Sequence, residues 1–497
     1  MPVTVITATT IGLEGRIVQV EVDIGPGLPA FNIVGLADTA VLEARERVRS
    51  AIKNSSFTFP ANRKTVSLAP SDVRKHGPAF DVPIAIGILA GSKQIKVPSH
   101  DTLFIGELSL HGDLRPIPGI IPLIMFAKKS GMRSVILPVG NSIDASMIDN
   151  IEILPAKNIG DITAHIEGKK RLTPAKYQLA RDRSPSHHEN PFEGIIGQDA
   201  AKRALIIAAA GHHNILLSGP PGIGKTLLAK AFANLLPDLT NKEFLDVAAI
   251  HSLRSSQPIT ERRKRPIRQV HHTASTISMI GGSYDLLPGE ISLAHHGVLV
   301  LDEIPEFPRH MIEALRQPLE DKRITITRSS GSVTYPANFL LFATSNPCPC
   351  GMLGTEKKSK QCTCTASIIR NYGKRISGPI MDRIDLQVNM EPIDASAIIF
   401  HEDSPKKDVE NIISRIAHVR ALRPCTNSEI TSQSLFDICQ LTEEARQFLA
   451  QTGDKLQLSA RSIHRIIKVS RTIADLELSS TINRRHIAEA FQFKIAN

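Results

Sequence analysis

Hydrophobic and polar positions follow two different periods along the first 165 residues. Alternation with period two is typical of half-buried strands, and strand-like stretches occur at Gly15–Ile24, Lys64–Leu68 and Ser134–Pro138. Apolar residues at helical spacing predict helices at Asp38–Asn54, Phe80–Ala90 and Ile120–Ser130. Strands and helices interleaved in this way predict an α+β domain over residues 1–165.

The rest of the chain divides into three further stretches. Residues 166–192 are polar and punctuated by proline, which predicts a linker. Short apolar runs then predict strands that are buried on both faces of a parallel sheet, and these runs are Ile215–Leu217, Gly297–Leu301 and Asn338–Asn346. We therefore predict an α/β domain over residues 193–390. Helical periodicity over Val409–Leu422, Thr442–Gln451, Arg461–Leu478 and Asn483–Phe493 predicts a helical domain over residues 391–497.

A phosphate-binding loop follows the first of these buried strands. The loop fits the pattern G-x-x-x-x-G-K-[ST] and consists of Gly219, Pro220, Pro221, Gly222, Ile223, Gly224, Lys225 and Thr226. A helical stretch, Leu227–Leu236, comes next, so the strand–loop–helix context of such a loop is complete. We expect Lys225 to reach the β and γ phosphates of ATP and the Thr226 hydroxyl to hold Mg²⁺.

Acidic and amide side chains end the two later buried strands. Asp302 and Glu303 follow Gly297–Leu301, and Asn346 ends the next strand. In a doubly wound sheet, the carboxyl ends of such strands lie beside the phosphate loop. We expect Asp302 to hold the hydration shell of Mg²⁺, and Glu303 and Asn346 to place the attacking water.

Two insertions carry clustered basic residues. Residues 251–290 contain Arg262, Arg263, Lys264 and Arg265, and residues 322–336 contain Lys322, Arg323 and Arg328. Alternating β-branched runs on both sides of Ser329–Ser332 predict a hairpin in the second insertion. The pair of basic insertions favours contact with a DNA backbone, although each cation taken singly fits a solvated surface charge equally well. His271 and His272 fit a DNA contact, a support for the insertion or internal packing.

Four of the six cysteines lie within residues 348–364. Cys348, Cys350, Cys362 and Cys364 could close a tetrahedral Zn²⁺ site, and the alternative is a basic loop with free thiols. A metal site, rather than a disulfide framework, is typical of a reducing compartment. Cys425 and Cys439 stand apart, and we expect both to be buried apolar residues.

Composition and charge indicate which kinds of partner and which compartment to expect. The formal net charge is +10, which favours a polyanion, nucleic acid first. No apolar run approaches the ~18 residues of a membrane span, so we expect no membrane association. Met1–Ile17 lacks a basic region followed by an apolar core, so we expect no secretory signal and a cytoplasmic protein.

Two stretches of the first domain resemble the protease domain of Lon. They are Lys75–Asp81, which reads KHGPAFD, and Ile105–Gly119. At the positions of the Lon catalytic Ser and Lys this chain has Ala79 and Ile121. The resemblance therefore implies a Lon-like fold without the Ser–Lys dyad and without peptidase activity.

Three later segments resemble AAA+ ATPases. The Ile195–Gln198 segment implies that Ile196 and Gly197 lie over the adenine, and Ser377–Asp385 implies that Arg383 is an arginine finger that acts on a neighbouring subunit. Leu458–Arg465 implies a sensor-2 helix in a C-terminal helical lid, with Ser459 as N-cap and Arg461 directed at the γ-phosphate. Arg375 and Arg465 are the alternatives for the two arginine roles.

Taken in order, these motifs resemble the bacterial magnesium-chelatase-like family of AAA+ ATPases. The resemblance implies a homo-hexameric ATPase that requires ATP and Mg²⁺ and acts on single-stranded or branched DNA. For the competence members of the family it implies a helicase that drives branch migration in natural transformation, together with recombination proteins. A magnesium-chelatase motor subunit and a protein-remodelling ATPase are the alternatives. An ATP-dependent protease and a non-catalytic binding module are further rivals.

Overall fold

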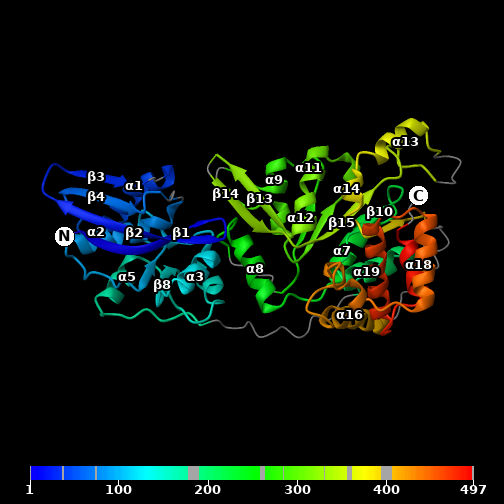
Figure 1. Cartoon of the computed structure of the whole chain (residues 1–497). Helices are drawn as coiled ribbons and strands as arrows, with labels where there is room; N and C mark the ends of the chain where they lie inside the picture. The colour runs from blue at the N-terminus through cyan, green and yellow to red at the C-terminus, as the bar shows by residue number, and fades with distance from the viewer. Residues whose placement is uncertain are drawn as a thin grey trace.

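A computed structural model describes residues 2–35, 38–72, 75, 77–176, 190–257, 263–283, 285–329, 331–354, 361–392 and 406–494. The molecule is elongated, with the N-terminal part of the chain at one end and the C-terminal helices at the other (Figure 1). Arg262 and the middle of the predicted linker, 177–189, lie outside the described residues.

The N-terminal part contains three sheets with interleaved helices, the smallest being the pair β6 (Glu107–Leu108) and β7 (Leu114–Arg115). The four-stranded sheet has the order β1-β2-β4-β3, with β1 (Val3–Ile11), β2 (Glu14–Gly25), β3 (Ala30–Val34) and β4 (Arg63–Ala69). A three-stranded parallel sheet is formed by β5 (Thr102–Phe104), β8 (Ser134–Pro138) and β9 (Glu152–Ala156). The main helices are α1 (Thr39–Asn54), α2 (Asp81–Gly91), α3 (Ile120–Lys129) and α5 (Ile159–Ile166). The predicted α+β character and the three predicted helices of this part are confirmed, to within a residue at each end.

The second part is built on a five-stranded parallel sheet. Its order is β11-β12-β15-β10-β16, with β10 (Ile215–Ser218), β11 (Ile267–Val270), β12 (Val298–Leu301), β15 (Leu340–Ser345) and β16 (Leu386–Asn389). The three buried strands predicted from apolar runs are β10, β12 and β15, and they lie side by side at the centre. The strand β11 was not predicted, because it is a partly exposed edge strand inside the basic insertion.

Helices cover both faces of this sheet. Ile215 and Leu217 enter a core shared with α6 (Asp199–Gly211) and α7 (Lys225–Leu235). Leu216 points to the opposite face, because side chains alternate along a strand, and enters a second core. The elements of that face are α9 (Thr276–Ile280), α10 (Glu290–Leu293), α11 (Arg309–Ala314), α12 (Arg316–Asp321) and the hairpin of β13 (Arg323–Arg328) and β14 (Gly331–Pro336).

The C-terminal helices share the first of these cores. They are α16 (Lys406–Ala421), α17 (Leu435–Ile438), α18 (Glu443–Lys455), α19 (Ala460–Leu476) and α20 (Arg484–Gln492). The four helices predicted after residue 391 are thus confirmed. Ser459 caps α19 as predicted, because its side chain accepts a hydrogen bond from the Ser462 backbone N–H. Among the described residues, every helix is too short or too polar to cross a bilayer.

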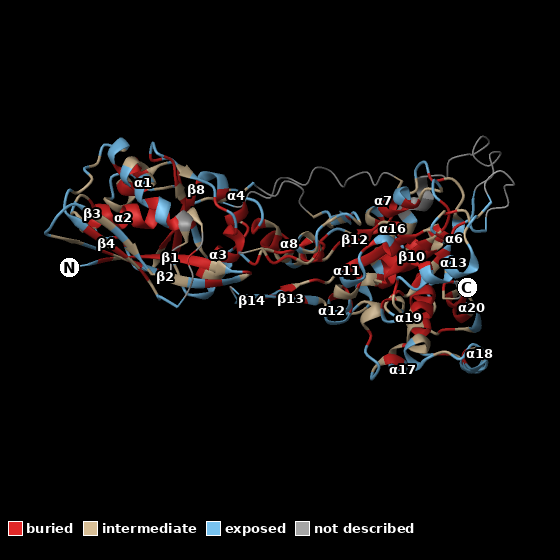
Figure 2. Cartoon of the chain, turned by 90° about the horizontal axis from the view of Figure 1, so that it is seen from above, coloured by how far each residue is buried: buried red, intermediate tan, exposed pale blue. Residues whose placement is uncertain are grey.

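One helix of the second part packs against the first part. Helix α8 (Asn241–Ser252) lies between the two ends of the molecule (Figures 1 and 2). Its residues Phe244 and Val247 share a hydrophobic core with Ile120 and Ile121 of α3. The Gly119 N–H also donates to the Ser252 carbonyl at 2.6 Å. The two parts of the chain are therefore joined by a common core.

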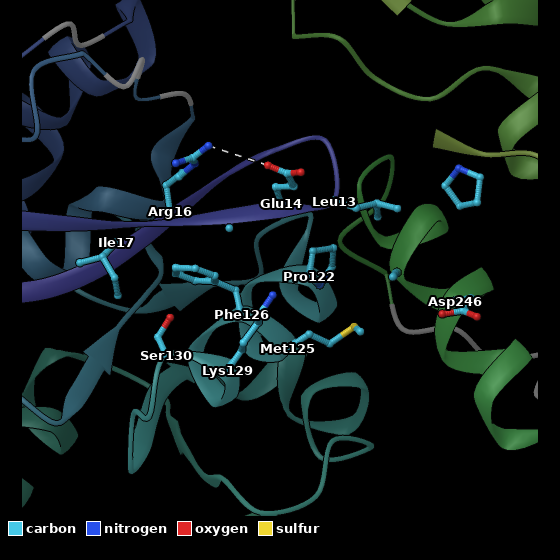
Figure 3. Close-up of a pocket in the computed structure, with 13 residues that line it drawn as sticks. Leu13, Glu14, Arg16, Ile17, Pro122, Met125, Phe126, Lys129, Ser130 and Asp246 are labelled. Carbon is cyan, nitrogen blue, oxygen red and sulfur yellow. Dashed lines mark ion pairs between the residues drawn. The ribbon is translucent and has the colours of Figure 1, made fainter. Parts of the chain in front are cut away.

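The β1–β2 turn makes a second contact between the two parts. A Cβ atom on Gly12, which has φ of +63°, would lie 2.3 Å from Val333 of β14, and Leu13 packs against the cores on both sides. A cavity of about 810 Å³ lies beside this turn (Figure 3). Glu14 and Arg16 pair at 3.8 Å on one wall, and Asp246 of α8 comes from the opposite side.

Candidate nucleotide site

The phosphate loop connects strand β10, which lies between β15 and β16, to helix α7. Gly222 and Gly224 have φ of +80° and +92°, a left-handed conformation that glycine adopts without steric cost. Apart from the neighbouring residues in the chain, no atom of the described residues lies within 4 Å of a Cβ built on either glycine, so the space that a phosphate would enter beside them is open. Gly224 caps α7, whose N-terminal N–H groups and dipole favour an anion here.

Lys225 is held under this loop by three acceptors. Its Nζ donates to the Gly219 carbonyl at 2.6 Å, the Ser345 carbonyl at 3.1 Å and Asn346 Oδ1 at 2.7 Å. Burial lowers the pKa of Lys225, while the carboxylates of Asp302 and Glu303 oppose this change. The ammonium group is therefore placed between the end of β15 and the loop, where it can exchange protein acceptors for phosphate oxygens.

The two carboxylates and Asn346 form one hydrogen-bonded chain with Lys225. Asn346 Nδ2 donates to Glu303 Oε1 at 3.1 Å. The Glu303 N–H donates to the Thr344 hydroxyl at 2.9 Å, and that hydroxyl donates to Asp302. Glu303 itself has φ of +53°, a strained conformation that is characteristic of functional sites. The two acids therefore hold fixed and different positions.

A cavity of about 210 Å³ brings these groups together. It is lined by Pro221, Gly222, Gly224, Lys225, Thr226, Leu227, Asp302, Glu303 and Asn346. The Thr226 hydroxyl and the Asp302 carboxylate are oxygen groups of the kind that could hold Mg²⁺ beside a nucleotide. Thr344 was missed by the sequence analysis, although a threonine just before the polar end of a buried strand is a usable signal.

Other predicted site residues lie outside this cavity. Ile196 and Gly197 form the turn before α6, and neither lines the phosphate cavity. Ala79 is half-buried, and Ile121 is fully buried in the apolar core of the first part. Neither side chain offers a nucleophile or a base, in agreement with the expectation drawn from the Lon resemblance.

Arg383 and Arg461 lie together, away from the phosphate loop of their own chain. Both guanidinium groups pair with Glu320, Arg461 at 3.4 Å. The two arginines line a separate polar cavity of about 440 Å³ that also includes Lys322 and Arg465. Neither arginine lines the phosphate cavity. Arg375, the alternative finger, pairs with Glu306 at 2.9 Å.

The first basic insertion supplies fewer available cations than its sequence indicates. The Arg265 side chain is only 9% exposed and donates to Glu243, to the Pro237 carbonyl and to the His296 carbonyl. The prediction that Arg265 contacts DNA is therefore wrong in this structure, because its donors are already used inside the fold. Lys264 is exposed and Arg263 is half-buried.

The predicted hairpin is confirmed as β13 paired with β14. Arg323 is exposed at its base, and the Arg328 Nε donates to the Gly282 carbonyl at 3.0 Å. Lys322 is half-buried in the cavity of Arg383 and Arg461, where burial lowers its pKa. Lys322 therefore faces the two arginines instead of extending along the hairpin.

The two histidines of the first insertion pack against each other. The rings of His271 and His272 lie 4.1 Å apart, and His272 meets Phe307 edge-on. The His271 Nδ1 is within 2.9 Å of the Thr273 hydroxyl. Among the open interpretations, these contacts favour support of the insertion.

The cysteines fall into two groups. The thiols of Cys348, Cys350, Cys362 and Cys364 gather at the end of β15, with their sulfur atoms within 4.8 Å of one another. Cys439 is buried, as predicted. Cys425 is exposed, so that prediction was wrong.

Comparison with known proteins covers almost the whole chain. Three family models match, described as "Magnesium chelatase, subunit ChlI" over residues 191–398, "Subunit ChlI of Mg-chelatase" over residues 20–141 and "Magnesium chelatase, subunit ChlI C-terminal" over residues 405–494. These models share the name of the chelatase subunit and follow one another along the chain.

Individual relatives agree with these matches. The chain is 40% identical over 494 residues to "Uncharacterized protein YifB" of Escherichia coli, covering 98% of this chain and 96% of that protein. It is 39% identical over 501 residues to "Competence protein ComM" of Haemophilus influenzae, covering 99% and 97%. A shorter match, 30% identical over 170 residues, is to "Lon protease 2" of Bacillus subtilis and covers 31% of this chain and 30% of that protein.

Proposed function

The chain belongs to the magnesium chelatase ChlI family of AAA+ ATPases, and on this premise we propose that it is an ATP-driven motor that moves DNA through a ring of six copies. In this proposal the motor promotes branch migration of joint DNA molecules during natural transformation and recombination. The name of the Haemophilus relative refers to competence and supports that setting.

The hydrogen-bonded chain from Lys225 through Asn346 to Glu303 is the observation that carries the proposal. It joins the group that would hold the γ-phosphate to the group that would polarise water, at 2.7 Å and 3.1 Å. When Lys225 turns to a phosphate it releases the Asn346 carbonyl oxygen. Asn346 and Glu303 are then free to orient a water molecule in line with the phosphate. Thr226 and Asp302 would hold Mg²⁺, which neutralises charge on the phosphate oxygens.

The positions of Arg383 and Arg461 support the proposed ring. Since neither lines the phosphate cavity of its own chain, they serve catalysis if a neighbouring chain presents its nucleotide to them. A head-to-tail contact of this kind is heterologous, and it generates a ring when its rotation closes. In the free chain Glu320 forms ion pairs with both guanidinium groups. In the ring, phosphate oxygens of the neighbouring chain's nucleotide would take the place of this carboxylate.

DNA is the proposed cargo of the ring. The net charge of +10 and the exposed cations Lys264 and Arg323 favour contact with a phosphate backbone. The β13–β14 hairpin runs directly into β15, which ends at Asn346. A movement of Asn346, the proposed water-positioning group, would thus reach the hairpin through the single strand β15.

A second candidate is a chelatase-type motor subunit or a protein-remodelling ATPase. The family descriptions, which name magnesium chelatase, are the observation in its favour. Both candidates use the same nucleotide chemistry, so they differ in what stimulates it. DNA stimulates the ATPase of a DNA motor and has no effect on that of a chelatase motor.

The proposal is tested with Glu303→Gln and a matched control, Glu306→Gln. Glu306 lies on the same short turn but pairs with Arg375 and does not line the phosphate cavity. We expect Glu303→Gln to bind a fluorescent ATP analogue as wild type does and to lose ATP turnover and unwinding of forked DNA. Glu306→Gln is expected to keep all three activities. Turnover unchanged by Glu303→Gln would refute the proposed roles.

A further inference from the structure

Four thiol groups surround a common point at the end of β15. Cys348 Sγ lies 3.3 Å from Cys350 Sγ and 3.6 Å from Cys362 Sγ, and the last two sulfur atoms are 3.6 Å apart. Cys364 completes the group, with all four sulfur atoms within 4.8 Å of one another. All four cysteines are free.

These distances fit a metal centre and do not fit disulfides. A disulfide brings two sulfur atoms to about 2.05 Å. Four thiolates around Zn²⁺, each at about 2.3 Å, place their sulfur atoms about 3.8 Å apart. The observed separations of 3.3 to 3.6 Å are close to that tetrahedral edge. Sulfur atoms this close repel one another as thiolates unless a cation lies between them.

The backbone supports this arrangement. The Gly351 N–H donates to the Cys348 carbonyl at 2.9 Å, and Gly351 has φ of +78°, so that Cys348–Gly351 forms a tight turn. Backbone N–H groups at Met352 and Thr363 donate to the Cys350 sulfur. Hydrogen bonds of this kind to ligand atoms orient and stabilise a metal site.

We propose that Cys348, Cys350, Cys362 and Cys364 bind one structural Zn²⁺ ion that fastens this turn against the phosphate loop. Four thiolates are a soft ligand set that selects zinc or iron over magnesium and calcium. With four protein ligands and no open position, the site is structural, not catalytic.

The zinc would link the segment after β15 to the start of a helix, α13 (Ala366–Gly373). Cys348 comes two residues after Asn346, whose Oδ1 accepts a hydrogen bond from Lys225. Cys364 precedes Thr365, which caps α13. A Cβ on Gly351 would lie 2.8 Å from Pro221 Cδ of the phosphate loop, so the turn is in direct contact with that loop. Loss of the metal would release the turn and loosen the loop.

Metal content tests the site directly. Wild-type protein and Cys425→Ser, which removes an exposed thiol outside the group, are purified without chelators and analysed by mass spectrometry of metals. We expect about one zinc ion per chain in both and less than about a fifth of that in Cys350→Ser and Cys364→Ser. Circular dichroism and gel filtration establish that the variants are folded.

A second measurement does not depend on the variants. Zinc is released from the wild type with a mercurial reagent, the thiols are restored with reductant, and Co²⁺ is added. We expect the visible absorption bands of tetrahedral thiolate-bound cobalt, which disappear when Zn²⁺ is added back. Wild-type protein that holds no zinc and gives no thiolate–cobalt bands would overturn the proposal. Stoichiometric iron in place of zinc would also overturn it.

The effect on nucleotide binding rests on the proposed ATPase function, whereas the metal content does not. We expect zinc removal to weaken binding of a fluorescent ATP analogue several-fold and zinc addition to restore it. If zinc is bound but its removal leaves the nucleotide affinity unchanged, only the proposed fastening of the loop is refuted. Lack of nucleotide binding by the zinc-loaded wild type would refute the proposed function and leave the metal site standing.

Discussion

The positions of Arg383 and Arg461 give a prediction that separates two arrangements of the ATPase site. Both pair with Glu320, and neither lines the phosphate cavity that contains Lys225. If both arginines act on the neighbouring chain, each complete site takes Lys225 from one chain and both arginines from the next. If Arg461 instead acts within its own chain, it must leave Glu320 and move to its own phosphate loop. The two arrangements respond in opposite ways when variants are mixed.

The expected magnitude follows from how the sites are assembled. Arg383→Ala and Arg461→Ala alone are each expected to lower turnover by about 10³-fold, the low end of the range for an arginine finger. Rings made from equal amounts of Lys225→Ala and Arg461→Ala chains would contain about one complete site in four, because sites form between neighbours at random. Rings made from Arg383→Ala and Arg461→Ala chains would contain no complete site.

The assay uses two differently tagged chains, co-expressed and purified through both tags. ATP turnover is measured for the two mixed rings and for each variant alone, with Lys225→Ala plus Arg383→Ala as the control for subunit mixing. Recovery with Lys225→Ala plus Arg461→Ala, and none with Arg383→Ala plus Arg461→Ala, is the predicted result. The reverse pattern would exclude action of Arg461 on the neighbouring chain and place it in its own chain's site.

Two further predictions concern stability and the contact between the two parts of the chain. Burial lowers the pKa of His295 to about 3 from 6.5. The unfolded chain thus binds the proton more readily, and this neutral histidine contributes stability that is present above pH 6.5 and is lost as the pH falls toward 3. Between pH 7.5 and 5 the free energy of unfolding should fall by about 2 kcal/mol because of this group. Urea titrations of the wild type should therefore show a steeper pH dependence than those of His295→Gln, whose side chain can still accept a hydrogen bond from the Asn338 N–H. Equal pH dependence in the two proteins would contradict the assignment. Gly12→Ala adds a Cβ 2.3 Å from Val333 at a residue in the left-handed conformation. We expect the free energy of unfolding to fall by about 1–2 kcal/mol and DNA to stimulate the ATPase less. Unchanged thermal unfolding and unchanged stimulation would contradict this prediction.

The sequence predicted those features that depend on local pattern. The strands β10, β12 and β15 were recognised because each is a short apolar run that is buried on both faces. Lys225, Asp302, Glu303 and Asn346 come together because the ends of parallel neighbouring strands meet at one edge of a sheet. No long-range information was needed for either step.

Features that depend on distant partners were not predictable. Helix α8 buries Phe244 against the first part of the chain, and a single helix does not reveal which part of the protein covers it. Arg265 belongs to a basic run, but Glu243 and two carbonyl groups hold it inside the fold. The shared partner of Arg383 and Arg461 is likewise separated from them by 63 and 141 residues.

The proposed function depends above all on DNA being the cargo of this ATPase. This is tested by the rate of ATP hydrolysis by the full chain without DNA and with single-stranded, duplex or forked DNA, at two salt concentrations. We expect strong stimulation, largest with branched or single-stranded DNA. It should decline steeply at the higher salt concentration, because contacts with the phosphate backbone release counterions. An ATPase rate that no DNA changes at either salt concentration would contradict the account and favour the chelatase-type or protein-remodelling alternative.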